Sequence, residues 1–341
     1  MKKTAFLLLS ILSAHNLFSQ KTYTIDSKFS FAANDGISFT DQYELKGKLD
    51  FTFFINSSFI CELGLEADKS EIDVENIIFR YLSSDYDILF GKYRNKIAAG
   101  DITSSQKSPV QAKSILENLL ISQGYINRSI GAGIETNKNF SPGYLFLKAS
   151  SIEAHFLEPQ FNAVYLHSFP ENIKAGIAGC YFPFFIKDQY LGDNSISSEA
   201  IEGDVENNFT LNLIAFRHEG TLIFGSETVF GKNIHDPIGL LYSGLYSSRD
   251  YFFGIDFYGG MRLYLDQTEI IPAARASALF PDTDRMDCNI IELSLNCKIG
   301  FTKDIRLDLA GGTRVITQYD YDENLVTSLD PLWNISFQVY F

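Results

Sequence analysis

The sequence is poor in the residues that usually carry redox and metal chemistry. It has only four cysteines, Cys61, Cys180, Cys288 and Cys297, and they show neither CxxC spacing nor Cys/His ligand spacing. Cys61 and Cys297 fall on the apolar phases of predicted strands, where cysteine usually acts as a small hydrophobic residue. We therefore expect no redox role, no metal and no cofactor.

Long apolar runs and basic residues are also scarce. No internal segment reaches the roughly 18 apolar residues that a spanning helix needs, although 45% of the 341 residues are hydrophobic and 14% are aromatic. This argues against a helical membrane protein. Lysine and arginine number 28 against 42 acidic residues, for a formal net charge of −14. Such acidity argues against nucleic acid and against anionic lipid surfaces as partners.

Recognisable catalytic and metal-binding motifs are missing. His155, His167, His218 and His235 have no serine nucleophile at a motif such as GxSxG. The acidic stretch 187–208 offers carboxylates for calcium but has no EF-hand spacing. We expect no enzyme. A lipase that uses a lipid-facing Ser/His pair is the alternative left open.

The N-terminus has the pattern of a secretory signal peptide. Lys2 and Lys3 form a charged region, and residues 5–12 form a short apolar region. Small or neutral residues then predict cleavage near Ser19–Gln20. We therefore expect residues 1–19 to be removed and residues 20–341 to form the mature chain.

Alternation of apolar and polar residues dominates the rest of the chain. In 43–55, for example, apolar Leu49 and Phe51 alternate with charged Lys48 and Asp50, which places the two kinds on opposite faces of a strand. Charges on one face suit a sheet with water on one side and lipid on the other. Sixteen strands are predicted, at 23–31, 43–55, 59–67, 72–81, 86–94, 128–135, 144–150, 161–167, 174–182, 209–217, 221–230, 239–247, 251–265, 288–300, 305–316 and 332–341.

The last ten residues show the alternation without a break. Trp333, Ile335, Phe337, Val339 and Phe341 alternate with polar residues and Tyr340, and the chain ends on an aromatic residue. Such a closing strand resembles the C-terminal signature of bacterial outer-membrane β-barrels. The resemblance implies that Trp333, Phe337 and Phe341 form the signal for the barrel-assembly machinery. An ordinary sandwich strand is the alternative.

The lengths of the connections favour the barrel. Short ones centre on Ser57, Ser84, Pro142, Pro170, Glu219, Ser248 and Lys303, and we place them at the periplasmic end. The segments 95–127, 187–208, 266–287 and 317–331 are long and fall at the outer end, as in bacterial barrels. To keep the short connections at one end and the long ones at the other, we interpret 266–287 as a loop and assign no strand to 272–279. The predicted fold is an all-β, transmembrane, antiparallel up-and-down barrel.

The insertion 95–127 is the most informative segment for function. Ser108-Pro109 predicts a helix start, and 110–121 then predicts a short helix. A long third loop with a short helix resembles the loop that folds into the lumen of sixteen-stranded general porins. The flanks, Phe90-Gly91-Lys92-Tyr93-Arg94 and Arg128-Ser129-Ile130-Gly131, loosely resemble the glycine-and-basic pattern of porins related to the phosphate-selective group.

The resemblance implies a set of pore-lining residues. The basic members are Lys92, Arg94, Lys96, Lys107, Lys113 and Arg128, and the acidic candidates for the opposite wall are Glu44, Asp50, Glu62, Asp256, Glu292 and Asp308. Bases in a narrow constriction act more strongly than distant, screened acids. We therefore expect a weak preference for anions. Alternatively, these bases lie on the solvated rim of the barrel and do not line the pore.

The sequence thus predicts an outer-membrane porin for passive diffusion of small hydrophilic solutes or ions. A structural or secretion-associated barrel whose external loops bind partners is the alternative. Expected partners are outer-membrane lipid and lipopolysaccharide, the barrel-assembly machinery and the solutes, without nucleic acid. A homotrimer is one assembly left open.

Deletion of Phe341 tests the terminal signature. We expect the shortened chain to fail to insert, because the closing strand loses its final lipid-facing aromatic residue. Heat-modifiable migration on a gel reports the folded barrel. Wild-type migration at normal abundance would show that the signature has no role here.

Overall fold

The computed structural model describes the barrel strands and part of the insertion. It describes residues 23–34, 43–67, 72–102, 109, 113–136, 143–151, 159–185, 205–233, 251–284, 286–302, 304–319 and 324–340, without the side chains of 23–48. The predicted signal peptide, Lys107 and Phe341 lie outside these residues, as does the Glu44 side chain.

Strands make up most of the described chain. They are β1 (Tyr23–Asn34), β2 (Tyr43–Phe54), β3 (Phe59–Ala67), β4 (Ile72–Leu82), β5 (Tyr86–Arg94), β6 (Arg128–Thr136), β7 (Gly143–Ser151), β8 (Pro159–Ser168), β9 (Lys174–Phe185), β10 (Val205–Arg217), β11 (Leu222–Lys232), β12 (Tyr251–Met261), β13 (Leu263–Leu265), β14 (Thr268–Phe280), β15 (Asn289–Gly300), β16 (Ile305–Tyr319) and β17 (Leu325–Tyr340). The helices are α2 (Ala99–Ile102), α3 (Ile115–Ser122) and the 3-10 turn η1 (Pro170–Asn172). Among the described residues, no helix has the length and apolarity that crossing a membrane requires.

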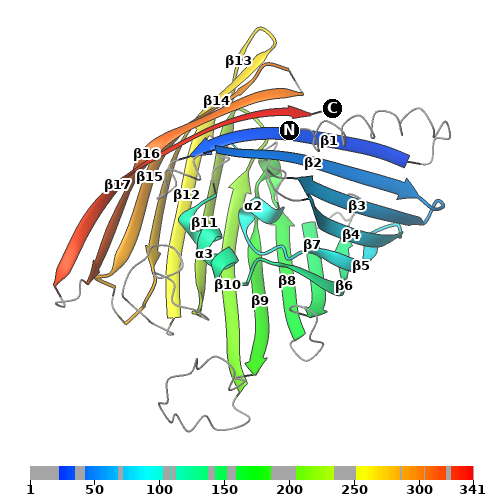
Figure 1. Ribbon diagram of the computed structural model, residues 1–341, viewed down its shortest axis with the longest axis horizontal. Coiled ribbons are helices and arrows are strands. Elements are labelled where there is room, and N and C mark those ends of the chain that lie inside the picture. The colour runs from blue at the N-terminus through cyan, green and yellow to red at the C-terminus, as the bar shows by residue number, and fades with distance from the viewer. Residues whose placement is uncertain are drawn as a thin grey trace.

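Hydrogen-bonded pairing runs around a ring. Each strand pairs antiparallel with its neighbour along the chain, and β1 pairs with β2 on one side and with β17 on the other. β13 continues β12 after a break at Arg262, and both pair with β14. The barrel therefore has 16 up-and-down strands, as the sequence predicts. Helices α2 and α3 lie inside the ring (Figure 1).

The two faces of the wall have opposite character. Large apolar side chains such as Phe90, Leu211 and Leu295 are 48–72% exposed on the outer face. Polar residues on the alternate phase, such as Asn162 and Lys298, are buried on the inner face. A soluble domain has the reverse distribution, whereas a barrel in lipid presents an apolar outer band and a polar interior. The period-two pattern in the sequence predicted this arrangement.

The interpretation of 266–287 as a loop is wrong, because β14 occupies most of it. The outward residues Ala274, Ala276 and Ala278 are too small to give a strong apolar signal, and Pro272 has no N–H for the ladder. The register places Pro272 opposite the break between β12 and β13, where a residue without an N–H is tolerated.

The predicted strand 239–247 lies outside the described residues. In the described sheet, β11 pairs directly with β12, from Leu222↔Met261 to Lys232↔Tyr251. The connection that contains Ser248 therefore starts and ends at the end of the barrel that carries the long loops. The sequence analysis placed it among the short periplasmic connections. The connections alternate between the two ends once β14 is included, but the interpretation of 317–331 as a long loop is wrong, because β16 ends at Tyr319 and β17 begins at Leu325. Short connections, at 55–58, 83–85, 137–142, 169–173, 218–221, 266–267 and 301–304, share one end.

Cysteine labelling tests the position of β14. Gln267 and Met286 both belong to the predicted loop 266–287, but in the structure β14 separates them, so they lie at opposite ends of the barrel. In intact cells, Met286→Cys should react with an impermeant maleimide and Gln267→Cys should react only after permeabilisation. The parent chain, with its four native cysteines, is the control for background labelling. Equal labelling of both variants would show that β14 does not cross the wall.

Candidate functional site

The insertion between β5 and β6 fills one half of the lumen. Helix α3 contacts β12 and β14, and α2 contacts β10. The insertion residues Ile97, Leu119, Leu120 and Tyr125 are all 0% exposed, and they pack in one cluster with inner-face residues of the wall such as Phe146. Each fully buried apolar side chain of this size contributes about 1.5–3 kcal/mol. Packing therefore holds the insertion against β7–β14.

Helix α3 begins later than the sequence analysis predicts. Its N-cap is Ser114, whose hydroxyl accepts a 2.9 Å hydrogen bond from the Glu117 backbone N–H. Ser114 and Glu117 have the spacing of a capping box, a stronger start signal than Ser108-Pro109. The predicted helix at 110–121 is therefore confirmed from Ile115 onward, and residues 110–112 lie outside the described residues.

Lys148 on β7 fixes the start of the insertion. Its ammonium group, in a side chain that is 3% exposed, donates to the Tyr93 carbonyl (2.6 Å), to Asn95 Oδ1 (3.0 Å) and to both oxygens of Ser129 (3.1 and 2.9 Å). It also lies 4.2 Å from the centroid of the Tyr93 ring, within cation–π range. Because these oxygens belong to β5, β6 and the insertion, the Lys148 amine links β7 to both strands and to the start of the insertion.

Further hydrogen bonds attach the insertion along the same half of the wall. Asn95 Nδ2 donates to Gln160 Oε1 on β8 at 2.7 Å, and Asn212 Nδ2 on β10 donates to the Ile97 carbonyl at 2.9 Å. The Tyr125 hydroxyl donates to the Lys232 carbonyl at the end of β11 at 2.5 Å. Burial raises the pKa of the Tyr125 phenol well above its ordinary value, so this group stays a neutral donor.

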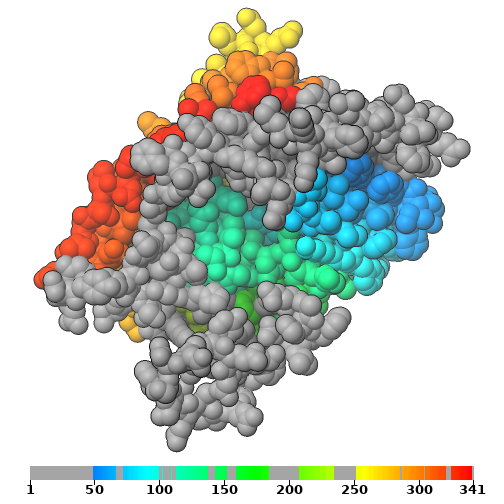
Figure 2. Space-filling model, in the orientation of Figure 1, coloured from blue at the N-terminus to red at the C-terminus, as the bar shows by residue number. Residues whose placement is uncertain are grey.

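The insertion also reaches the opposite wall. Pro109 is buried and shares a small cavity with Asn296 on β15, Ala310 on β16 and Asn334 on β17. In a ring of sixteen strands, β17 lies across the lumen from β8, where Gln160 holds Asn95. The described insertion therefore touches both sides of the lumen. The space-filling view shows it in teal at the centre of the barrel, between β17 in red and β2–β4 in blue (Figure 2).

The inner face of β3–β7 keeps water-accessible charge. Arg80 on β4 pairs with Glu62 (3.0 Å), Asp87 (3.0 Å) and Glu135 (3.4 Å), and Lys96 of the insertion pairs with Glu135 at 2.5 Å. We call these five residues the Arg80 cluster. A cavity of about 180 Å³ lies between them and the insertion. Glu62 and Lys96 side chains are each 29% exposed, whereas inner residues of β7–β12 such as Phe146 are 0% exposed.

Several predicted pore-lining residues lie on this side. Glu62 and Lys96 belong to the Arg80 cluster, and Arg94 pairs with Glu117 of α3 at 3.3 Å. Asp50 shares the inward phase, because its carboxylate lies beside Gly64 on β3. Lys113 is exposed, just before α3.

Lys92 and Arg128 lie at the long-loop ends of β5 and β6, and their pore-lining role stays a prediction. They share the alternation phase of Phe90 and Ile130, which are 52% and 64% exposed on the outer face. Lys92 Nζ donates to the Val74 carbonyl at 3.3 Å, and Arg128 pairs with Glu75. Two of the bases on which the expected anion preference rests are therefore not shown to line the lumen.

Gly91 has an unusual backbone conformation within β5. It has φ +129°, and a Cβ there would lie 1.9 Å from the Ile77 carbonyl oxygen. A second irregularity lies nearby, where the β3–β4 register shifts between Gly64 and Leu65. The sequence analysis consequently missed Arg80, Asp87 and Glu135. The alternation of β5 and β6 carries the signal that could have found the two acids.

The other acidic candidates lie on the inner face of β12–β16. Asp256 accepts two hydrogen bonds from Arg275, at 2.8 and 2.9 Å, and Glu292 pairs with Arg314. Asp308 accepts from Gln338 at 3.2 Å. Neither Arg275 nor Arg314 was singled out from the sequence. On this wall, Asp256–Arg275 and Glu292–Arg314 are ion pairs.

The chain forms an antiparallel ring with an apolar outer face and a polar inner face, and its long third outer connection lies in the lumen. These features define a porin-type β-barrel. Solved structures bear this out. The chain matches OmpT with loop L8 deleted, an outer membrane protein of Vibrio cholerae, with a TM-score of 0.63, 11% identity, and coverage of 94% of this chain and 99% of that one.

Two further neighbours have the same fold. The outer membrane channel DcaP of Acinetobacter baumannii matches with a TM-score of 0.60 and 12% identity over 95% of this chain and 99% of that one. OmpF of Salmonella typhi, in a complex with daunomycin, matches at 0.58 and 8% over 94% and 97%. No protein-family model and no curated protein matches the sequence. The likeness therefore concerns the fold.

Replacement of Lys148 by methionine tests how the insertion is held. Methionine keeps most of the volume but leaves the oxygens of Tyr93, Asn95 and Ser129 without their shared donor, which should lower the local stability of the insertion by about 1–3 kcal/mol. We expect faster proteolysis within 95–127 and noisier, larger conductance steps. The control is Lys174→Met, an exposed lysine on β9. Wild-type behaviour of Lys148→Met in both assays would contradict the anchoring role.

Proposed function

We propose that the protein is an outer-membrane channel for passive diffusion of small hydrophilic solutes or ions. The observation that carries the proposal is the unequal division of the lumen. The insertion packs against inner-face residues of β7–β14, while the side chains of Glu62 on β3 and of Lys96 remain 29% exposed. A polar, partly open interior inside an apolar outer band suits a narrow aqueous passage.

The charges along this passage favour cations weakly. The Arg80 cluster holds three carboxylates against two bases, and the Arg94–Glu117 pair adds no net charge. Asp50 adds a further carboxylate on the inner face, and Lys113 adds one base, so the excess among these described side chains is one carboxylate. Because low-dielectric walls strengthen charge effects in a narrow lumen, this small excess biases permeation. The weak anion preference expected from the sequence is replaced by a weak cation preference.

The proposal includes the cellular setting. The pattern of Lys2, Lys3 and residues 5–12 supports export by a cleaved signal peptide, and the closing strand supports insertion by the barrel-assembly machinery. The neighbours named above are outer-membrane proteins, and one form of the Vibrio cholerae protein is described as a trimer. A homotrimer in the outer membrane, surrounded by lipid and lipopolysaccharide, is the assembly we propose.

The competing proposal is a structural barrel whose external loops bind partners. The fully buried packing of the insertion against β7–β14 favours it to the extent that the lumen is closed. A membrane enzyme has no such support from the described residues. Conductance separates the two remaining functions.

The conductance experiment uses the purified barrel in a planar bilayer. We expect discrete conductance steps with a reversal potential that indicates a weak cation preference. Glu62→Gln should shift the cation-to-anion permeability ratio about two- to five-fold toward anions, because a unit charge about 4 Å from an ion contributes about 1 kcal/mol even in water.

The matched control is the double variant Lys92→Glu with Arg128→Glu. Both residues lie on the outward phase, so their reversal should leave the reversal potential within the scatter of the wild type. A larger shift from this control than from Glu62→Gln would place the passage elsewhere. The absence of any conductance would favour the structural barrel.

A further inference from the structure

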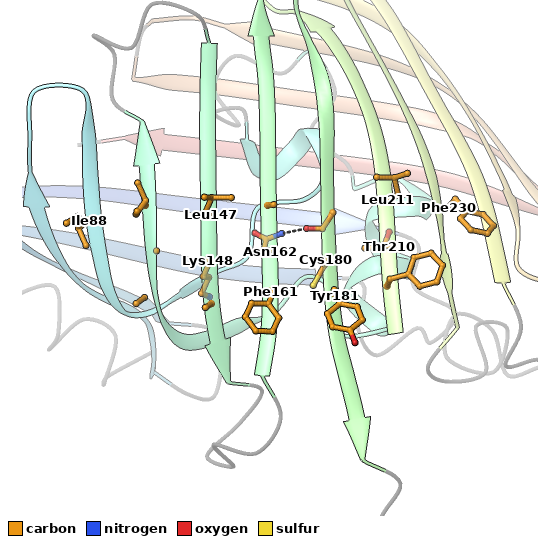
Figure 3. A pocket seen from close by; sticks show the side chains of 17 residues that line it. Ile88, Leu147, Lys148, Phe161, Asn162, Cys180, Tyr181, Thr210, Leu211 and Phe230 are labelled. Atoms are coloured by element: carbon orange, nitrogen blue, oxygen red, sulfur yellow. Dashed lines mark hydrogen bonds between the residues drawn. The ribbon is translucent and has the colours of Figure 1, made fainter. Parts of the chain in front are cut away.

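Two cavities of the wall differ in the face on which they lie. A groove of about 1000 Å³ on the outer face of β5–β11 is lined mainly by apolar side chains, such as Phe161, Tyr181 and Leu211 (Figure 3). These three side chains are 41–48% exposed and face away from the lumen, where a barrel in lipid meets hydrocarbon. The cavity of about 180 Å³ beside the Arg80 cluster lies on the inner face. A hydrophilic solute can reach only this second cavity from the lumen.

The cavity beside the Arg80 cluster has a mixed lining. The polar residues that line it are Asn76, Arg80, Arg94, Lys96 and Glu135. The apolar ones are Ile78, Leu89 and Phe146. The side chains of Arg94 and Lys96 are 32% and 29% exposed, so the cavity opens to water beside them. The apolar residues are at most 8% exposed and close its inner end.

The hydroxyl of Tyr93 is an unused hydrogen-bonding group in this lining. The Tyr93 side chain is 4% exposed and lines the cavity. Its hydroxyl has no hydrogen-bond partner within the described part of the chain. It lies over the inner face of β6, since a Cβ at Gly133 would be 2.5 Å from its oxygen. Burial of a hydroxyl without a hydrogen bond is unfavourable, so a polar group that enters the cavity would supply the missing bond.

The Tyr93 ring is held in position by its neighbours. Lys148 Nζ lies 4.2 Å from the ring centroid, and the Phe146 ring meets it edge-on with the centroids 6.4 Å apart. A group whose position is already fixed loses little conformational entropy when it binds a ligand. The Tyr93 hydroxyl is therefore preorganised to recognise a polar group in the cavity.

The charges around the cavity favour a neutral solute. The Arg80 cluster contains three carboxylates and two bases, and Arg94 is paired with Glu117 of α3. An anion would face the excess of carboxylates. A cation would compete with Arg80 and Lys96 for carboxylates that these bases already neutralise. A neutral solute meets neither obstacle.

The hydrogen-bonding groups at the cavity suit hydroxyls. Arg80 uses Nε and Nη1 in its three ion pairs, which leaves the two N–H donors of Nη2. Lys96 donates to Glu135 at 2.5 Å and to the Tyr144 hydroxyl at 3.1 Å, which leaves one of three ammonium donors. The Asn76 amide and the Tyr93 hydroxyl can each donate and accept. A set that both donates and accepts matches a hydroxyl group, which does the same.

The volume of the cavity limits the size of the solute. At about 30 Å³ for each water molecule, about 180 Å³ corresponds to roughly six waters. Drug-sized ligands occupy larger pockets, of about 300–1,000 Å³. The cavity is therefore suited to one small polyol or a single sugar ring, with Ile78 and Leu89 facing the C–H groups.

We propose that this cavity binds a neutral polyhydroxylated solute of about the size of a monosaccharide. The Tyr93 hydroxyl, Arg80 Nη2 and the Asn76 amide would hydrogen-bond to the hydroxyl groups of the solute. The inference rests on the proposed channel, because an open lumen brings solutes to the cavity, and it adds a substrate class to that function.

The first test compares three sugars that share a ring but differ in charge. Binding of glucose, glucuronate and protonated glucosamine to the purified full-length barrel in detergent is measured by saturation-transfer NMR. We expect glucose to bind, and the two charged sugars to bind at least about threefold more weakly because of the charges around the cavity. Tighter binding of either charged sugar would overturn the assignment to neutral solutes.

The second test removes single hydrogen-bonding groups. Tyr93→Phe should weaken glucose binding about two- to tenfold, because one hydrogen bond is lost. Its thermal stability should not fall, because no described residue bonds to the hydroxyl. Asn76→Leu should also weaken binding. The control is Tyr165→Phe, which removes an exposed hydroxyl from the outer face of β8 and should bind glucose like the wild type.

Folding and conductance are followed separately from binding. Heat-modifiable migration confirms that each variant forms the barrel. Wild-type glucose binding by both Tyr93→Phe and Asn76→Leu would overturn the proposal. A loss of thermal stability in Tyr93→Phe with unchanged glucose binding would assign the hydroxyl a structural role and would also overturn it. Glucose binding without conductance would support the site and contradict the channel, whereas conductance without glucose binding would do the reverse.

Discussion

The pairing of β1 with β17 is the interaction on which the rest of the structure depends. Hydrocarbon offers no partner for a backbone N–H or C=O, so a sheet can cross a membrane only when its two edges pair with each other. Their register extends from Lys28↔Tyr340 to Asn34↔Asn334. Closure fixes the strand phases, and each phase then decides which side chains meet lipid and which face the interior. The apolar outer band and the inner charges both follow from this closure.

The closed ring also explains why the insertion needs its own anchors. A lumen lined by polar residues offers little apolar surface, yet the inner wall near α3 supplies Phe146, Val229 and Phe252. These residues pack against the insertion, and Lys148 with Asn212 hydrogen-bonds to it. The side chains of Glu62 and Lys96 are less covered and are each 29% exposed. The same wall therefore has a packed half and a hydrated half, and this asymmetry is the basis for the proposed passage.

The sequence predicted the fold well because the faces of a barrel strand differ strongly. The alternation is plain in β2 and β15, but it is weak in β14, where alanines face outward and Pro272 interrupts the ladder. Connection lengths revealed the insertion. They could not reveal the phase of Lys92 and Arg128. Lys148 was missed because its partners lie up to 55 residues away and become neighbours only in the folded ring.

The central claim is that the insertion narrows an aqueous passage without sealing it. Liposome swelling with uncharged solutes of increasing size tests this claim directly, because the assay depends on the width of the passage and not on its charge. The account predicts that small sugars enter at a rate that falls steeply with size. It also predicts that Lys148→Met raises the size limit. No swelling with the smallest solute, for a barrel shown to be folded, would contradict the account.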